Sequence, residues 1–105
     1  MKTLLTEQDI LNNIRMELSK HGIVLRQQVG MFCTLDGRKV QIGIKGTPDL
    51  LFVGFDGQVA FIEVKTETGR VRPEQTKFIN LMKKYNYKAG VARSTQDALK
   101  IIGRI

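Results

Sequence analysis

The alternation of apolar and polar residues along the chain predicts three helices and six strands. Ile10, Ile14 and Leu18 recur at helical spacing and predict a first helix over residues 6–20. Pro73 is a good first residue for a helix over 73–85, and a last helix is expected over 95–102. Strands are expected over residues 23–29, 31–35, 39–44, 49–54, 58–66 and 88–92. The order helix, five strands, helix, strand, helix indicates an α/β fold.

Two Asp-Gly pairs lie between apolar runs and predict hairpins. Asp36-Gly37 joins strands 31–35 and 39–44. For the second hairpin, a three-residue loop at 55–57 would place Asp49 opposite Glu63. Both carboxylates, with Lys65, would then project from one face at one end of the hairpin. A two-residue loop would instead pair Asp49 with Val64 and split the carboxylates across the sheet.

The segment 58–92 has the pattern of a strand, a helix and a second strand, which predicts parallel pairing within a mixed sheet. The apolar runs at 50–53 and 59–62 are typical of strands buried on both faces. On the intervening helix, Phe78, Met82 and Tyr85 share one stripe, which we expect to face the sheet. With 105 residues, we expect one domain over 1–105, in which a mixed sheet is flanked by helices.

The positive charge is concentrated at one end of the chain. The net charge is +7, yet residues 1–69 hold eight Lys/Arg and eight Asp/Glu, whereas 70–105 hold nine and two. Such a basic segment attracts nucleic acid, or it is simply a solvated surface. A single cysteine, Cys33, excludes an internal disulfide framework and a cysteine-based zinc site. No apolar run reaches the ~18 residues of a membrane helix, so we expect a soluble, cytoplasmic protein with no membrane association.

Asp49, Glu63 and Lys65 interrupt the most apolar part of the chain. A carboxylate in such surroundings needs a partner or a metal, because an isolated buried charge is costly. Two opposed carboxylates repel each other, and a divalent cation between them removes the repulsion while it activates water for attack on a phosphodiester. The Val64 carbonyl is a further candidate ligand, and Lys65 suits a place beside the attacked phosphate. The alternative is that these charged residues lie at an ordinary exposed strand end.

The string Lys45-Gly46-Thr47-Pro48-Asp49-Leu50, followed by Ile62-Glu63-Val64-Lys65 and then Gln75, resembles the VRR-NUC family of the PD-(D/E)XK nucleases. The resemblance runs from about residue 6 to 94 and is to small stand-alone phage and bacterial members. It implies a restriction-endonuclease-like fold and a Mg²⁺- or Mn²⁺-dependent nuclease that acts on structured DNA, such as branched, flapped or four-way forms, in a bacterial or phage-infected cell.

The resemblance also implies roles for individual residues. Asp49 and Glu63 would be metal ligands together with the Val64 carbonyl, and Lys65 would be the catalytic lysine. Gln75 would complete the catalytic set from the following helix. Its periodicity places it on the Phe78 stripe, facing the sheet, although a glutamine here also suits a helix start that bonds the backbone.

The first helix carries a further acidic candidate. The resemblance implies that Glu7 is an additional metal ligand, and it lies on the apolar stripe of its helix. The alternative is an acid that the helix dipole favours in any first turn. Glu17 is a weaker candidate on the edge of the same face.

Basic residues around the site are expected to contact DNA. Arg70 and Arg72 precede the second helix and would touch phosphates, with Lys45 beside the acidic motif. Lys77 and Lys84 form an outward face that either binds DNA or is solvated. We expect a homodimer with two sites. Two rival interpretations are a non-catalytic nucleic-acid-binding module using the basic C-terminal third, and a small interaction protein with a purely structural core.

Overall fold

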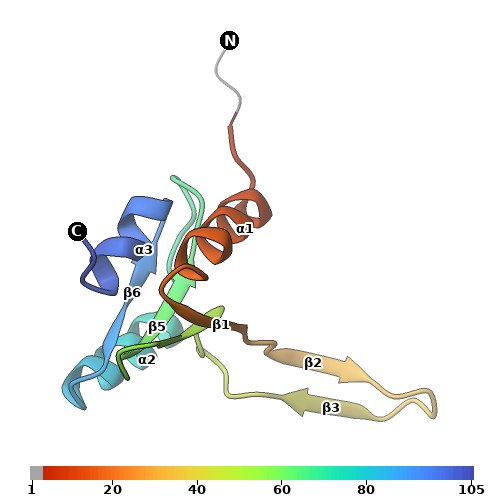
Figure 1. Ribbon diagram of the computed structural model, residues 1–105. Helices are drawn as coiled ribbons and strands as arrows, with labels where there is room; N and C mark the ends of the chain where they lie inside the picture. The colour runs from red at the N-terminus through yellow and green to blue at the C-terminus, as the bar shows by residue number, and fades with distance from the viewer. Residues whose placement is uncertain (1–3) are drawn as a thin grey trace.

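The computed structural model describes residues 4–105 and contains all nine predicted elements (Figure 1). In chain order they are α1 (Glu7–Leu18), β1 (Gly22–Arg26), β2 (Gly30–Cys33), β3 (Lys39–Ile42), β4 (Leu50–Gly54), β5 (Val59–Val64), α2 (Pro73–Lys84), β6 (Lys88–Ala92) and α3 (Thr95–Ile101). The predicted element order is therefore confirmed. The prediction of one domain over 1–105 includes residues 1–3, which lie outside the described residues.

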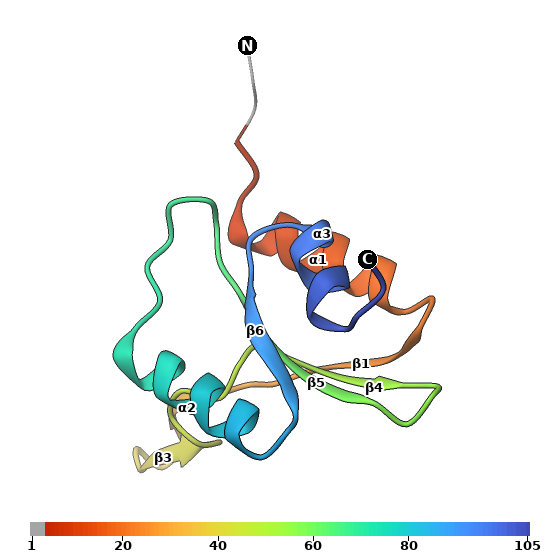
Figure 2. The same cartoon turned by 90° about the vertical axis from the view of Figure 1, so that its left-hand side faces the viewer.

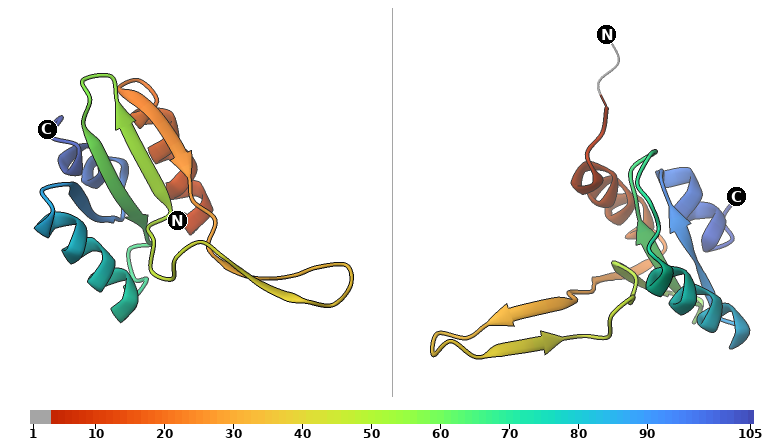
Figure 3. Two further views of the ribbon diagram at one scale, coloured as in Figure 1. Left: turned by 90° about the horizontal axis from the view of Figure 1, so that it is seen from below. Right: turned by 180° about the vertical axis from the view of Figure 1, so that it is seen from behind.

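Four of the strands form a mixed sheet in the order β1-β4-β5-β6. The β5–β6 pair is parallel, as the strand-helix-strand segment predicts, and the other two pairs are antiparallel. In the described part of the chain, β2 and β3 pair only with each other and form a separate two-stranded ribbon. This ribbon projects away from the rest of the molecule in Figures 1 and 3. We call residues 30–42 the arm; the sequence did not predict that it leaves the main sheet.

The core lies between one face of the sheet and the helices α1 and α3, while α2 lies on the other face (Figure 2). Ile14 and Leu18 from α1 meet Phe52 and Ile62 from the central strands, all at most 2% exposed. A capping box begins α1, because Thr6 and Asp9 exchange hydrogen bonds between side chain and backbone. The apolar stripe of α1 is thereby directed onto the sheet.

The opposite face of the sheet is less covered than its apolar runs predict. β4 and β5 bury one face and half-bury the other, because α2 packs mainly on β5 and β6. Ile23 on β1 stays 57% exposed. On α2 the buried residues are Gln75 and Ile79, and Phe78 packs edge-on against Phe61. Tyr85 is 59% exposed at the end of the helix, so its predicted place against the sheet is wrong.

The register of the central hairpin is the predicted one. Leu50 pairs with Ile62 and Val53 with Val59, which leaves the three-residue loop at 55–57. Gly57 closes this loop with φ of +86°, a conformation that glycine adopts without strain. None of the helices in the described part of the chain has the length and apolar character needed to cross a bilayer.

Candidate active site

The regular pairing of β4 with β5 stops one residue before the acidic pair. Beyond Leu50 and Ile62, Asp49 turns its carboxylate toward β5, and the Val64 N–H donates a 2.8 Å hydrogen bond to Asp49 Oδ2. On the other side, the Gln27 N–H following β1 donates to the Asp49 carbonyl at 2.7 Å. Asp49 is thus held between β1 and β5, with its backbone and its side chain both fixed.

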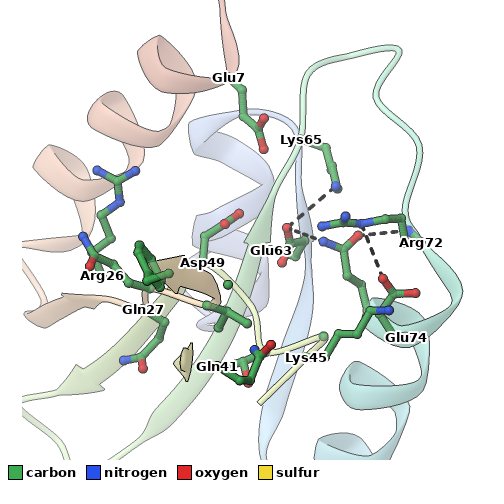
Figure 4. Close-up of a pocket in the computed structure, with 17 residues that line it drawn as sticks. Glu7, Arg26, Gln27, Gln41, Lys45, Asp49, Glu63, Lys65, Arg72 and Glu74 are labelled. Carbon is green, nitrogen blue, oxygen red and sulfur yellow. Dashed lines mark hydrogen bonds and ion pairs between the residues drawn. The ribbon is translucent and has the colours of Figure 1, made fainter. Parts of the chain in front are cut away.

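Three acidic side chains from three elements converge at this edge of the sheet. Glu7 from the first turn of α1, Asp49 and Glu63 each offer a carboxylate oxygen, and these oxygens lie within 4.8 Å of one another. Figure 4 shows the three side chains and Lys65 pointing toward a common space. The predicted convergence of Asp49, Glu63 and Lys65 on one face is confirmed, since Lys65 Nζ lies 3.8 Å from Glu63 Oε1.

Glu63 is the most deeply buried member, at 2% exposed. Its Oε1 accepts a 3.1 Å hydrogen bond from Gln75 Nε2, whereas Oε2 has no partner. Within residues 4–105 it is the only buried side-chain nitrogen or oxygen without one. Burial, together with the nearby Asp49 carboxylate, raises the pKa of Glu63 to about 8, although Lys65 opposes the shift. A buried, unsatisfied carboxylate oxygen is costly unless something binds it.

The donor set fits a divalent cation of the Mg²⁺ or Mn²⁺ type. Such hard cations prefer carboxylate and carbonyl oxygens, and the cluster supplies three carboxylates, of which Glu63 has one unpaired oxygen. A cation bound by these carboxylates would remove the repulsion between Asp49 and Glu63. These residues therefore fit a metal, and no soft ligand contributes, because Cys33 is on the arm.

Gln75 combines both alternatives that its sequence position leaves open. Its amide nitrogen donates to Glu63, and its amide oxygen accepts a 2.9 Å hydrogen bond from the Arg72 N–H. The second bond begins α2, and the first reaches the acidic cluster. Because the two bonds use opposite ends of one amide, the helix start and the orientation of the Glu63 carboxylate are coupled.

The acids lie in an open cleft of about 680 Å³ that extends from the cluster to the inner end of the arm. The loop before Asp49 forms part of its wall and requires glycine at position 46. Gly46 has φ of +94°, and a Cβ there would lie 2.4 Å from the Glu74 carbonyl oxygen of α2. This close approach lets the loop pack on the start of α2 and places Lys45 at the cleft.

The loop between β5 and α2 is fixed by an arginine that the sequence did not single out. Arg93 Nη1 donates to the carbonyls of Thr66 and Gly69 at 2.6 and 2.7 Å, with Glu67 at 3.3 Å. These hydrogen bonds fix the backbone segment that directly follows Lys65. Nothing in the local pattern around 93 signals this role, because it depends on the parallel pairing of β5 with β6.

The structure brings some of the predicted DNA-contacting residues to the cleft and not others. Lys45 and Arg72 line it, whereas Arg70, Lys77 and Lys84 are exposed outside its lining. The alternative acid on α1 takes no part, since Glu17 pairs with Lys20 at 2.8 Å.

Other cleft residues were missed by the sequence reasoning. They are polar or aromatic side chains from the β1 end, the arm and α2: Arg26, Gln27, Gln28, Phe32, Gln41 and Glu74. For the first three, the signal is the polar run 26–28 within the predicted strand 23–29, which acquires meaning only once β1 pairs with β4.

The mixed sheet, its flanking helices and the acidic edge define a restriction-endonuclease-like α/β domain. A solved structure described as a VRR_NUC domain superposes with a TM-score of 0.67, at 23% identity, covering 91% of this chain and 92% of that chain. The family model of the VRR-NUC domain matches residues 5–96, and the chain belongs to this family. No curated protein matches the sequence at a significant level. Family membership indicates a nuclease that acts on DNA.

Proposed function

We propose that this protein is a metal-dependent endonuclease that hydrolyses phosphodiester bonds in structured DNA, such as flapped, branched or four-way forms. The observation that carries the proposal is the cluster of the Glu7, Asp49 and Glu63 carboxylates in an open cleft, in which buried Glu63 keeps one oxygen unpaired and has the Lys65 ammonium 3.8 Å from the other. A carboxylate cluster next to a lysine suits phosphodiester hydrolysis, because a bound cation and the ammonium group both stabilise the negative charge that develops on the phosphate.

Each side chain has a distinct task in this proposal. Asp49, Glu63 and Glu7, with the Val64 carbonyl, would hold Mg²⁺ or Mn²⁺. When bound, the cation supplies a water of lowered pKa and offsets the charge of the phosphate. Lys65 donates a hydrogen bond to a non-bridging phosphate oxygen or to the attacking water. Gln75 keeps the Glu63 carboxylate turned toward the cluster through its 3.1 Å hydrogen bond.

The basic cleft residues favour selection by shape rather than by base sequence. Lys45 and Arg72 line the cleft beside the acids and suit contacts with phosphates, which position DNA without reading its sequence. Arg70 and the exposed lysines of α2, Lys77 and Lys84, would extend these contacts along the backbone.

The decisive experiment is cleavage of a panel of linear, flapped, splayed and four-way DNAs with Mg²⁺, with Mn²⁺ and with EDTA. We expect metal-dependent cutting of at least one structured form. Lys65→Ala should lower the cleavage rate by at least about 10²-fold, because a donor to the developing charge is lost. Asp49→Asn should abolish cutting while it keeps an oxygen that accepts from the Val64 N–H.

The matched control is Lys100→Ala, which removes a lysine from the exposed surface of α3. It should cut like the wild type. Titration of Mn²⁺ into metal-free protein should detect binding to the wild type and not to Asp49→Asn. DNA binding without cutting under any metal condition would contradict the proposal and favour a non-catalytic binding module.

We also propose a homodimer as the active form. A domain of 105 residues offers a small footprint, and two copies would present two acidic clusters to the two strands of a four-way junction. Light scattering of the protein bound to junction DNA measures this directly. A strictly monomeric complex would contradict it.

A further inference from the structure

The arm is separate from the main sheet and from the core. Within residues 4–105 its two strands pair only with each other, and none of the core residues comes from residues 30–42. From Met31 to Ile42 every residue except Thr34 is exposed. An isolated two-stranded ribbon is at best marginally stable in water. The arm therefore contributes little to the fold, and its exposed side chains are available to a binding partner.

The inner end of the arm forms part of the wall of the acidic cleft. Phe32 on β2 and Gln41 on β3 line the same cavity as Asp49 and Glu63. Lys39 lies two residues from Gln41 toward the tip of the arm, which is a distance of about 7 Å along β3 at the usual rise of a strand. That distance spans about two base-pair steps of B-form DNA. A nucleic acid seated at the acids would therefore run past the arm.

The arm and its flanking residues carry a net positive charge, which complements a polyanion. Residues 26–45 hold four Lys/Arg and one Asp, within a first half of the chain that is otherwise neutral or acidic. Asp36 forms an ion pair with Arg38 at 3.1 Å. For Lys39 and Lys45, no acidic group in residues 4–105 lies within ion-pair distance. These cations remain available for phosphates.

We infer that the arm binds the DNA segment that flanks the cut phosphate. Lys39 contacts the backbone, and Phe32 packs on a base at the edge of the cleft. Phe32 is 44% exposed, and aromatic side chains form stacking platforms for unpaired bases. This inference rests on the proposed function and assigns part of its substrate recognition to a segment outside the nuclease core.

The first test measures how salt weakens the binding of a splayed DNA in the absence of metal. Each lost phosphate contact lowers the slope of log K against log salt by about one. Lys39→Ala should show this reduction together with weaker binding at low salt. Lys100→Ala, the same change on α3, should keep the wild-type slope. An unchanged slope in Lys39→Ala would overturn the backbone contact.

The second test compares two neighbours on β2. Phe32 lines the cleft and Met31 does not, although both are exposed and neither contributes to the core. Phe32→Ala should weaken binding to DNA with an unpaired base at the branch at least about tenfold more than binding to a plain duplex. Met31→Ala should bind both as the wild type does. Equal behaviour of the two variants would overturn the stacking contact.

The outcome is separable from that of the nuclease proposal. If the wild type cuts DNA and both arm tests are negative, the nuclease function stands and the inference about the arm is wrong. If the salt slope falls but the wild type never cuts, the arm binds DNA and the nuclease function is wrong. Light scattering of the arm variants tests the alternative that the arm contacts a second copy of the chain. Conversion of a dimer to monomers would assign the arm to subunit contact and overturn its role in DNA binding.

Discussion

The two hairpins of this protein share a turn and differ in almost everything else. In both, three residues of the form X-Asp-Gly close the loop, at 35–37 and 55–57, with the glycine at φ of +88° or +86°. The β4–β5 hairpin nevertheless forms the centre of the sheet, whereas the β2–β3 hairpin projects into solvent. Turn chemistry thus determines which residues pair, and the side chains beyond the turn determine where the hairpin lies.

The central hairpin also shows how a distant turn sets the geometry of the acids. Because each residue of β4 pairs with a defined partner on β5, the loop at 55–57 decides that Asp49 and Glu63 end on the same face. The arm has the same regular pairing but no acidic cluster at its inner end. Register is a means of placing side chains, and only the central hairpin places a cluster of acids.

The largest expected difference between the hairpins is in folding stability. Phe52→Ala, in the core of β4, should lower the free energy of unfolding by about 3–5 kcal/mol, since it removes a fully buried ring. Phe32→Ala on the arm should change it by less than about 0.5 kcal/mol. Urea denaturation of both variants measures this. Equal losses would mean that the arm is packed in solution.

A second prediction uses the raised pKa of Glu63. The folded protein holds this proton up to a pKa of about 8, whereas the ordinary value is 4.5. Between these values the folded state binds more protons than the unfolded state, so the stability from this group is present at low pH and lost as pH rises through 8. In EDTA, the wild type should therefore lose melting temperature from pH 6 to 8.5 relative to Glu63→Gln.

The same pair of proteins tests the link to the metal. Mn²⁺ at pH 8.5 should restore melting temperature to the wild type, because a cation replaces the proton on Glu63. It should leave Glu63→Gln unchanged. Parallel pH profiles of the two proteins in EDTA would contradict the raised pKa.

The smallest expected effect concerns the two turn glycines. Gly37→Ala and Gly57→Ala each place a side chain in a left-handed conformation with open space around it, so the strain should be about 1 kcal/mol in both. In the central hairpin this cost should lower global stability. In the arm it should only increase local opening, seen as faster hydrogen exchange at β3 with an unchanged urea midpoint. A shift of that midpoint in Gly37→Ala would couple the arm to the core.

The sequence predicted the features that depend on local rules. The helical spacing of the α1 residues, the Asp-Gly turns and the strand-helix-strand segment each involve neighbours along the chain, and all were confirmed. The convergence of Asp49, Glu63 and Lys65 followed from one assumption about the turn. The roles of these residues in chemistry stay predictions.

Features set by contacts between distant segments were not predictable. Arg26 and Gln27 reach the cleft because β1 pairs with β4, which no local pattern reveals. Arg93 binds loop carbonyls more than twenty residues away. Tyr85 is the C-cap residue of α2 and is 59% exposed, although its spacing places it on the Phe78 stripe. In each case the missing information was the position of a second element.

The independence of the arm has a consequence for how such a protein diversifies. Among residues 4–105, no core side chain comes from residues 30–42, and lengthening a connection costs only about 0.6 kcal/mol for each doubling of its length. This segment can therefore gain, lose or exchange residues while the domain still folds. Relatives that share the main sheet and helices are expected to diverge most at the arm. Grafting another ribbon in place of the arm is therefore a direct route to a nuclease with an altered preference for DNA structure.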